Sequence, residues 1–165
     1  RQLKTAVNDE IRKLIDEQKS AVAGQVQAQE QRFRQEAEAH TLFLEASLLA
    51  QRGKPEDAVR AYRRVLALEP RHLMAWILLA ASLRQLGRPD EAHEAARKAL
   101  EIDPASAQAL YGIAAAFALQ RNRERMLETL TQAFQGSGDL RDEALNDPAF
   151  REYWQDPGFK DLAEA

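Results

Sequence analysis

Cysteine is absent from the 165 residues of the chain, which excludes disulfide bonds and metal sites built on thiolates. Only three histidines are present, and no two of them are four residues apart, the spacing that places two ligands on one helix face. We therefore expect neither a metal site nor a cofactor.

A chain without cysteine tolerates either redox environment. We expect a cytoplasmic location, and a periplasmic or membrane-tethered parent protein stays open.

The sequence also lacks the signatures of enzymes, nucleic-acid-binding proteins and membrane spans. It has no glycine-rich phosphate loop and no serine in a nucleophile elbow, so we predict that the chain is not an enzyme and has no catalytic residues. The net charge is only −3, which gives no electrostatic reason to expect nucleic acid as a partner. No apolar run approaches the roughly 20 residues of a transmembrane helix. Because the chain begins at Arg1 and not at methionine, we expect a processed or partial sequence.

What the sequence does contain is a repeat of 34 residues. Gly53 and Gly87 are separated by this distance, and so are Pro55 and Pro89. The same spacing relates Ala58 to Ala92, Leu66 to Leu100, and Pro70 to Pro104, and it extends to a third copy in the series Leu42, Trp76 and Leu110 and the series Ala46, Ala80 and Ala114. A fixed period of this length indicates stacked copies of one supersecondary unit.

Each copy has the pattern of two helices joined by a turn. In the second copy, the apolar residues of the first helix follow steps of three and four: Trp76, Leu79, Ala80 and Leu83. Gly87 stands where a helix commonly ends in a residue of positive φ, and Pro89 suits the first turn of the next helix. We predict that this second helix runs to about Ile102.

On these residues the chain resembles the tetratricopeptide repeat family. The second repeat matches the family pattern at Trp76, Leu79, Ala80, Leu83, Gly87, Ala92, Ala96, Ala99 and Pro104, and the first repeat at Leu42, Ala46, Leu49, Gly53, Ala58, Tyr62 and Pro70. The third repeat departs from the pattern, with Arg121 in place of the turn glycine, as a terminal copy often does. The resemblance implies an all-α fold, a right-handed α-solenoid of three helix hairpins with a concave binding face.

We predict three segments in the chain. Residues 1–38 form a long N-terminal helix, residues 39–136 form three tetratricopeptide repeats (39–72, 73–106 and 107–136), and residues 137–165 form C-terminal capping helices. The last segment is acidic, because it holds eight acidic and three basic side chains. We interpret this excess charge as a solvated surface.

The N-terminal segment contains no proline and one glycine, and its apolar residues recur in steps of three and four, which predicts one helix. Its apolar stripe comprises Leu3, Val7, Ile11, Leu14, Ile15, Val22, Val26 and Phe33. We expect this stripe to mediate oligomerisation by pairing with copies of the chain as a coiled coil. Packing onto a partner helix or into a groove, and partial disorder of the isolated segment, are the alternatives. No helix breaker precedes the first repeat, so we expect the helix to continue into it.

Two Asp-Pro pairs divide the C-terminal segment, at Asp147-Pro148 and at Asp156-Pro157. Aspartate at the N-cap followed by proline in the first turn is a common start of a helix. Aromatic residues follow each start: Phe150, Tyr153, Trp154 and Phe159. We predict two short helices whose aromatic side chains seal the exposed core of the last repeat.

In the family that the chain resembles, the first helix of each pair lines the concave face. The residues at these positions here are Phe43, Leu44, Ser47, Met74, Ile77, Leu78, Ala81, Arg84, Gln85, Gln108 and Tyr111. The lysines, asparagines and arginine of the family's carboxylate clamp are missing, so the acidic tail of a heat-shock chaperone is not an expected ligand. Most of these side chains are apolar, and soluble proteins rarely expose large apolar patches without a use.

Two hypotheses for function follow. In the first, the protein is an adaptor or scaffold that binds a helical or extended apolar peptide in the concave groove and forms homo-oligomers through the N-terminal helix. In the second, the protein is structural, and a neighbouring copy of the chain fills the groove. The sequence does not identify the partner.

Overall fold

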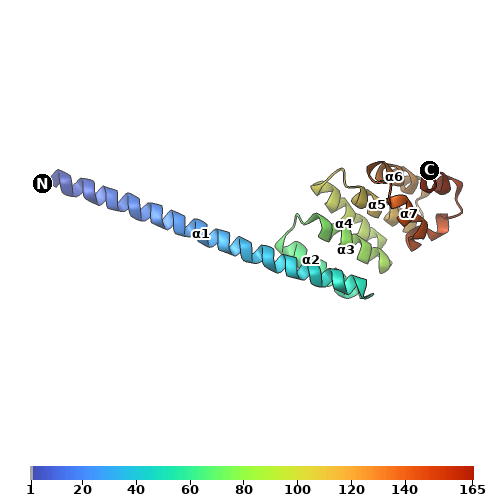
Figure 1. Cartoon of the computed structure of the whole chain (residues 1–165), viewed down its shortest axis with the longest axis horizontal. Coiled ribbons are helices and arrows are strands. Elements are labelled where there is room, and N and C mark those ends of the chain that lie inside the picture. Colours follow the sequence, from blue (N-terminus) through green and yellow to red (C-terminus); the bar gives the residue numbers. More distant parts are fainter. Residues whose placement is uncertain (1) are drawn as a thin grey trace. The chain divides into compact units, whose positions relative to one another are not determined.

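The computed structural model describes residues 2–165, and all regular structure in this range is helical. Its elements are α1 (Gln2–Gln51), α2 (Pro55–Leu68), α3 (Leu73–Gln85), α4 (Pro89–Ile102), α5 (Ala107–Leu119), α6 (Arg123–Gly136), α7 (Leu140–Asn146), the 3-10 helix η1 (Pro148–Tyr153) and α8 (Pro157–Ala163) (Figure 1). By its contacts the chain divides into a unit that ends at Glu38 and a unit from Ala39 to Ala165. The predicted all-α fold of stacked helix pairs with a long N-terminal helix is confirmed.

The turns inside the first two hairpins depend on glycine. Gly53 and Gly87 have φ values of +69° and +67°, a conformation that residues with a Cβ rarely adopt. Each glycine lies two residues after the end of a first helix, so the chain reverses there and the second helix begins at Pro55 or at Pro89. The 34-residue spacing of glycine and proline therefore encodes the hairpin turn itself.

The first helices of the second and third repeats begin with equivalent caps. The Nδ1 atom of His72 accepts a hydrogen bond from the backbone N–H of Ala75, and the hydroxyl of Ser106 accepts one from that of Ala109. His72 and Ser106 are 34 residues apart. His72 thus caps the N-terminus of α3, because its side chain accepts a hydrogen bond from a backbone N–H that has no partner within the helix.

The third hairpin turn carries backbone strain. Arg121 occupies the position of Gly53 and Gly87 and has a φ of +59°, the only positive φ at a non-glycine residue between 2 and 165. Its guanidinium forms an exposed ion pair with Glu152 at 3.1 Å, a type of contact that contributes little to stability. The left-handed conformation of an arginine is therefore not offset by a strong local interaction.

We expect Arg121→Gly to raise the free energy of unfolding by about 0.5–1 kcal/mol, because glycine adopts this φ without strain while it adds some unfolded-state entropy. Urea denaturation followed by circular dichroism measures the change. Arg121→Ala is the matched control, since it removes the same ion pair and keeps the strain. A loss of stability in the glycine variant equal to that in the alanine variant would contradict this account.

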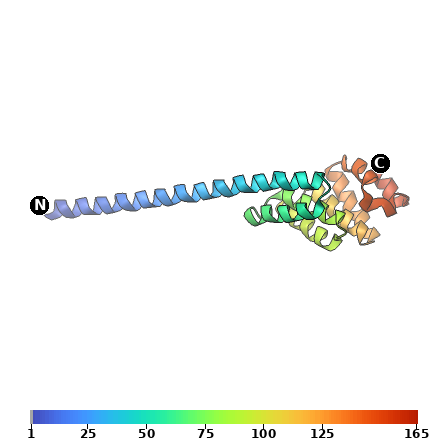
Figure 2. The same cartoon turned by 90° about the horizontal axis from the view of Figure 1, so that it is seen from below.

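The core of the repeat unit consists of small and large side chains in alternation. Consecutive helices from α2 to α6 contact one another and lie side by side in both views (Figures 1 and 2). The alanines that recur with the repeat, Ala46, Ala58, Ala80, Ala92 and Ala114, are at most 1% exposed and allow the helices to approach closely. Tyr62, Leu83, Met126 and Leu130 fill the space between them and are also buried. This packing buries one face of each first helix in the core and leaves the opposite face available.

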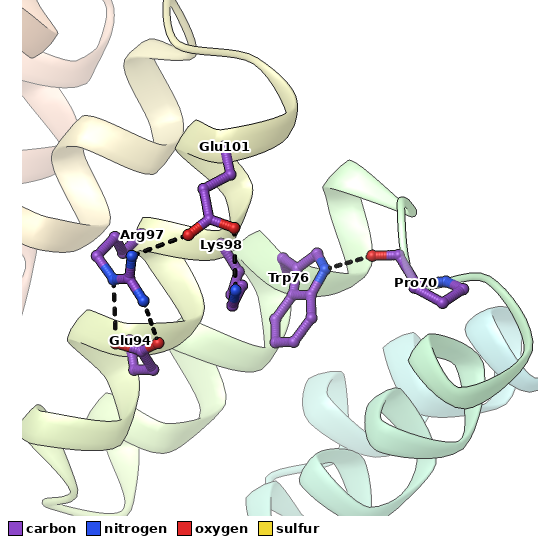
Figure 3. A network of polar contacts seen from close by, with 6 residues as sticks. All are labelled: Pro70, Trp76, Glu94, Arg97, Lys98 and Glu101. Atoms are coloured by element: carbon purple, nitrogen blue, oxygen red, sulfur yellow. Dashed lines mark hydrogen bonds and ion pairs between the residues drawn. The ribbon is translucent and has the colours of Figure 1, made fainter.

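Polar contacts between neighbouring side chains lie on the exposed surface of the repeat helices. On α4, Arg97 lies between Glu94 and Glu101, and Lys98 also reaches Glu101 at 2.9 Å (Figure 3). These pairs are one helical turn apart and exposed, so each stabilises the helix only slightly. The indole N–H of Trp76 donates to the carbonyl oxygen of Pro70 at 2.9 Å and thereby ties α3 to the loop that precedes it.

Three short elements close the C-terminal end of the repeats. Asp147 and Asp156 accept hydrogen bonds from the backbone N–H groups of Ala149 and Phe159, which confirms both predicted N-caps. The first of the two segments, η1, is a 3-10 helix, and the second, α8, is an α-helix. The rings of Phe150 and Phe159 stack with centroids 5.6 Å apart, and both side chains are fully buried. The predicted aromatic seal is therefore present.

Helix α1 is continuous from Gln2 to Gln51, so the expectation that the N-terminal helix continues into the first repeat is confirmed. In its own unit, every residue from Leu3 to Glu38 is exposed. None of the described helices is both long enough and apolar enough to span a membrane.

Candidate binding cleft on the concave face

The first helices of the three hairpins are residues 39–51 of α1, α3 and α5. Along α3, Met74, Ile77 and Ala81 follow one another at steps of three and four and so share a face. Met74 is 38% exposed, and Ile77, Leu78 and Ala81 are half-buried. On α1, Leu44 is 56% exposed. The first two repeats thus leave accessible apolar surface at the positions where the sequence predicted a groove.

Two predicted groove residues of the first repeat make contacts inside their own hairpin. The hydroxyl of Ser47 donates to the carbonyl oxygen of Phe43 at 2.9 Å and accepts a hydrogen bond from the hydroxyl of Tyr62 at 3.3 Å. The ring of Phe43 stacks on the imidazole of His72 with centroids 4.7 Å apart. Both side chains are half-buried. Ser47 therefore has less capacity to bond a ligand than its position suggests, while Phe43 still exposes part of its ring.

The prediction that Tyr111 lines an open groove is wrong. This residue is only 3% exposed, because η1 packs against α5 and covers its face. The hydroxyl of Tyr111 donates to Oδ2 of Asp147 at 2.9 Å, and its ring meets the ring of Phe150 edge-on with centroids 5.5 Å apart. Burial raises the pKa of the Tyr111 phenol above its ordinary value, and the negative charge of Asp147 raises this pKa further. The C-terminal segment thus fills the concave face at the third repeat.

Arg84 marks the border between the open and the filled part of the concave face. Its Nη1 atom lies 3.5 Å from Oδ2 of Asp147, and its guanidinium carbon lies 5.8 Å from the centre of the Tyr111 ring. The side chains of Arg84 and Asp147 are 14% and 17% exposed. The buried Nε and Nη1 atoms of Arg84 donate no hydrogen bond within the described residues. Charge attraction, together with the face of the tyrosine ring, holds the guanidinium here.

A cleft of about 850 Å³ lies between the end of α3, which carries Arg84, and the C-terminal segment. Its lining comes from the end of α3, the end of α5, helix α7 and the start of η1: Ala81, Arg84, Gln85, Leu119, Asp142, Glu143, Asn146, Asp147, Pro148 and Ala149. Three of these residues, Ala81, Arg84 and Gln85, are among the predicted groove residues. Gln108 is exposed and is not part of the cleft lining.

Most of the cleft lining was not predicted from the sequence. The wall formed by α7 and η1 comes from the segment that we expected to cap the end of the repeats. A sequence signal was available, because Asp147 combines a helix N-cap with a charge next to buried aromatic residues. No local pattern, however, indicates that this aspartate meets Arg84, which is 63 positions away in the chain.

The lining of the cleft is mixed in chemical character. Apolar atoms come from Ala81, Leu119, Pro148 and Ala149, and side chains with charges of both signs or with neutral amides line the rest. In the part of the chain that the structure describes, no group of three or more potential ligand side chains could hold a metal ion. The arrangement can therefore exclude water from an apolar side chain and pair with charges beside it.

Comparison with known families gives one match. The model of the family described as tetratricopeptide repeat matches residues 43–107 and, in a second overlapping match, residues 77–135. Together the two matches span more than half of the chain. A search of curated proteins found no match.

Solved structures show the same fold. A structure of YrrB, described as a TPR protein with an unusual peptide-binding site, is 26% identical over 61% of this chain, with a TM-score of 0.58. Residues from position 41 of MamA from Desulfovibrio magneticus RS-1 are 22% identical over 76% of this chain and 70% of that one, with a TM-score of 0.62. The Sgt2 TPR domain from Aspergillus fumigatus is 18% identical over 77% of this chain and 78% of that one, with a TM-score of 0.61. The matched region spans about half (52%) of the YrrB chain.

Proposed function

Because this chain belongs to the tetratricopeptide repeat family, we propose that it is a protein-interaction adaptor that binds a helical or extended peptide on its concave face. The observation that carries this proposal is the accessible apolar surface along α3, which leads from Met74 through Ile77 to the cleft at Ala81. An amphipathic helix or an extended segment placed there would bury apolar side chains of both partners. The proposed activity is binding and not catalysis.

The comparison with YrrB supports this proposal in general terms. That protein is described as having an unusual peptide-binding site, and it shares 26% of aligned residues with this chain. This chain also departs from an open groove, since its C-terminal segment covers the face of α5 that carries Tyr111 in the third repeat. The peptide would therefore bind chiefly against the first two repeats and the wall of the cleft.

The second part of the proposal concerns the N-terminal helix. Its apolar stripe is exposed along its whole length, with exposures of 48% at Ile11, 45% at Ile15, 54% at Val22 and 73% at Phe33. Contact with a second copy would bury these side chains at about 25 cal/mol per Å² of apolar area. We propose that copies of the chain pair through this stripe as a coiled coil and so present several binding surfaces together.

This part is tested by replacing two stripe residues one heptad apart with glutamate. We expect the Ile15→Glu/Val22→Glu variant to be a monomer by light scattering at concentrations where the unmodified chain is an oligomer, because two charges would be buried in the seam. Ser20→Glu/Gln27→Glu is the control, since it adds the same charges with the same spacing on the opposite face. The control should keep the oligomer.

The same experiment separates the adaptor from the structural alternative, in which a neighbouring copy fills the groove. A monomeric stripe variant that still binds peptide supports the adaptor. A stripe variant that keeps the mass of the unmodified oligomer would contradict pairing through α1 and would favour assembly through the concave face.

A further inference from the structure

We propose that the cleft between α3 and the C-terminal segment selects a partner peptide with basic side chains beside apolar ones. The inference rests on the proposed peptide-binding function and specifies the chemistry of the peptide. It follows from which charges of the cleft are paired within the chain and which are not.

The single cation of the cleft lining is already paired. The Nη1 atom of Arg84 lies 3.5 Å from Oδ2 of Asp147, so the two opposite charges of this pair neutralise each other within the cleft lining. Asp147 is further engaged by the hydroxyl of Tyr111 at 2.9 Å. Neither residue therefore offers an unpaired charge to a ligand.

Two acidic side chains remain on the same wall. Asp142 and Glu143 line the cleft from the first turn of α7 and are exposed. Within residues 2–165, no ion pair is formed by either carboxylate at a distance of 4.0 Å or less. The sequence around them is acidic as well, with eight acidic and three basic side chains in residues 137–165. The cleft thus presents a net negative charge, which attracts cations and repels acidic peptides.

Apolar surface lies within the same cleft. Leu119 is 38% exposed and lines it together with Pro148 and Ala149. A peptide that places an apolar side chain against Leu119 would bring its neighbouring residues to the wall of α7, where a lysine or arginine can pair with Asp142 or Glu143. Ala81 continues this surface toward Ile77 on the same face of α3, so one peptide can contact both the apolar groove and the acidic wall.

The test uses the full chain and two synthetic amphipathic peptides of equal length, one built from leucine and lysine and the other from leucine and glutamate. Fluorescence anisotropy measures binding of each peptide at low salt. We expect the Leu/Lys peptide to bind and the Leu/Glu peptide to bind at least about tenfold more weakly, because it meets like charges in the cleft. Equal or stronger binding of the Leu/Glu peptide would overturn the inference, and so would the absence of Leu/Lys binding.

Site-directed variants locate the effect. Asp142→Asn/Glu143→Gln should weaken binding of the Leu/Lys peptide about fivefold and reduce its salt dependence, which corresponds to two partly exposed ion pairs. Asp161→Asn/Glu164→Gln is the control, since it removes the same charge from exposed residues outside the cleft lining. Equal weakening by both variants would overturn the inference in favour of a nonspecific charge effect. A change in oligomeric mass in the cleft variant alone would assign the cleft to a second copy of the chain.

A third variant separates this inference from the proposed function. If the neutral variant Ile77→Asn abolishes binding of the Leu/Lys peptide while the cleft variant does not change it, the apolar groove stands and the selection for basic side chains is wrong. If the cleft variant weakens binding and Ile77→Asn leaves it unchanged, the acidic cleft stands and the proposed apolar groove is wrong.

Discussion

The Phe150→Ala variant is expected to lose about 3–5 kcal/mol of the free energy of unfolding, the range for truncating a buried phenylalanine. The side chain of Phe150 is fully buried and packs between Tyr111 of α5 and Phe159 of α8. Its removal leaves a cavity at the junction of the repeats and the cap, and it removes the ring that covers Tyr111. Because each repeat depends on its neighbour, the loss should reach the third repeat as well as the cap.

Urea denaturation measures this effect with two intrinsic probes, since Trp76 lies in the second repeat and Trp154 in the cap. Removing one tryptophan at a time as Trp76→Phe or Trp154→Phe distinguishes the two signals. Phe150→Leu is the control, because it keeps most of the apolar volume and should cost less than about 1.5 kcal/mol. If Phe150→Ala cost less than about 1 kcal/mol, the aromatic cap would not be the seal described here.

The hairpins could be predicted from the sequence because their determinants are local. Gly53 and Gly87 adopt positive φ at the turns, and the prolines that follow them begin the second helices. The cap of His72 could also have been found from the period, since Ser106 occupies the equivalent position 34 residues later. Repetition therefore carries information about turns and caps that a single copy does not.

The filled third repeat could not be predicted in the same way. In the sequence, Tyr111 stands at a groove position of the third repeat, and nothing local distinguishes it from an exposed groove residue. It is buried by a tertiary contact with the segment around Asp147, which lies 36 positions later in the chain. The aromatic residues of the C-terminal segment predict that it covers the core of the last repeat, but their pattern does not indicate which face of α5 they cover. The position of Asp142 and Glu143 in the cleft lining could not be predicted either, because it also depends on tertiary contacts of the C-terminal segment.

The N-terminal helix shows a different limit. Its periodicity of three and four predicts a helix, and the structure has one. The exposed stripe from Leu3 to Phe33 does not itself say what covers it. Self-association through this stripe therefore remains a proposal that the light-scattering experiment tests.

The second large effect concerns the groove. We expect Ile77→Glu to weaken peptide binding by about thirtyfold or more, which corresponds to about 2 kcal/mol for a charge placed at the centre of an apolar interface. Ile77 is half-buried and lies between Met74 and Ala81 on one face of α3, so the new carboxylate would enter the surface where a peptide must exclude water. Circular dichroism checks that the variant is folded.

The most direct test of peptide binding on the concave face uses peptides selected by display on the immobilised full chain. Their dissociation constants are measured for the unmodified chain, for Ile77→Glu, and for Ala67→Glu, which adds the same charge at an exposed position of α2. The account predicts that Ile77→Glu loses about thirtyfold in affinity or more and that Ala67→Glu binds as the unmodified chain does. Selected peptides that bind all three proteins equally would place the binding surface elsewhere and contradict the account.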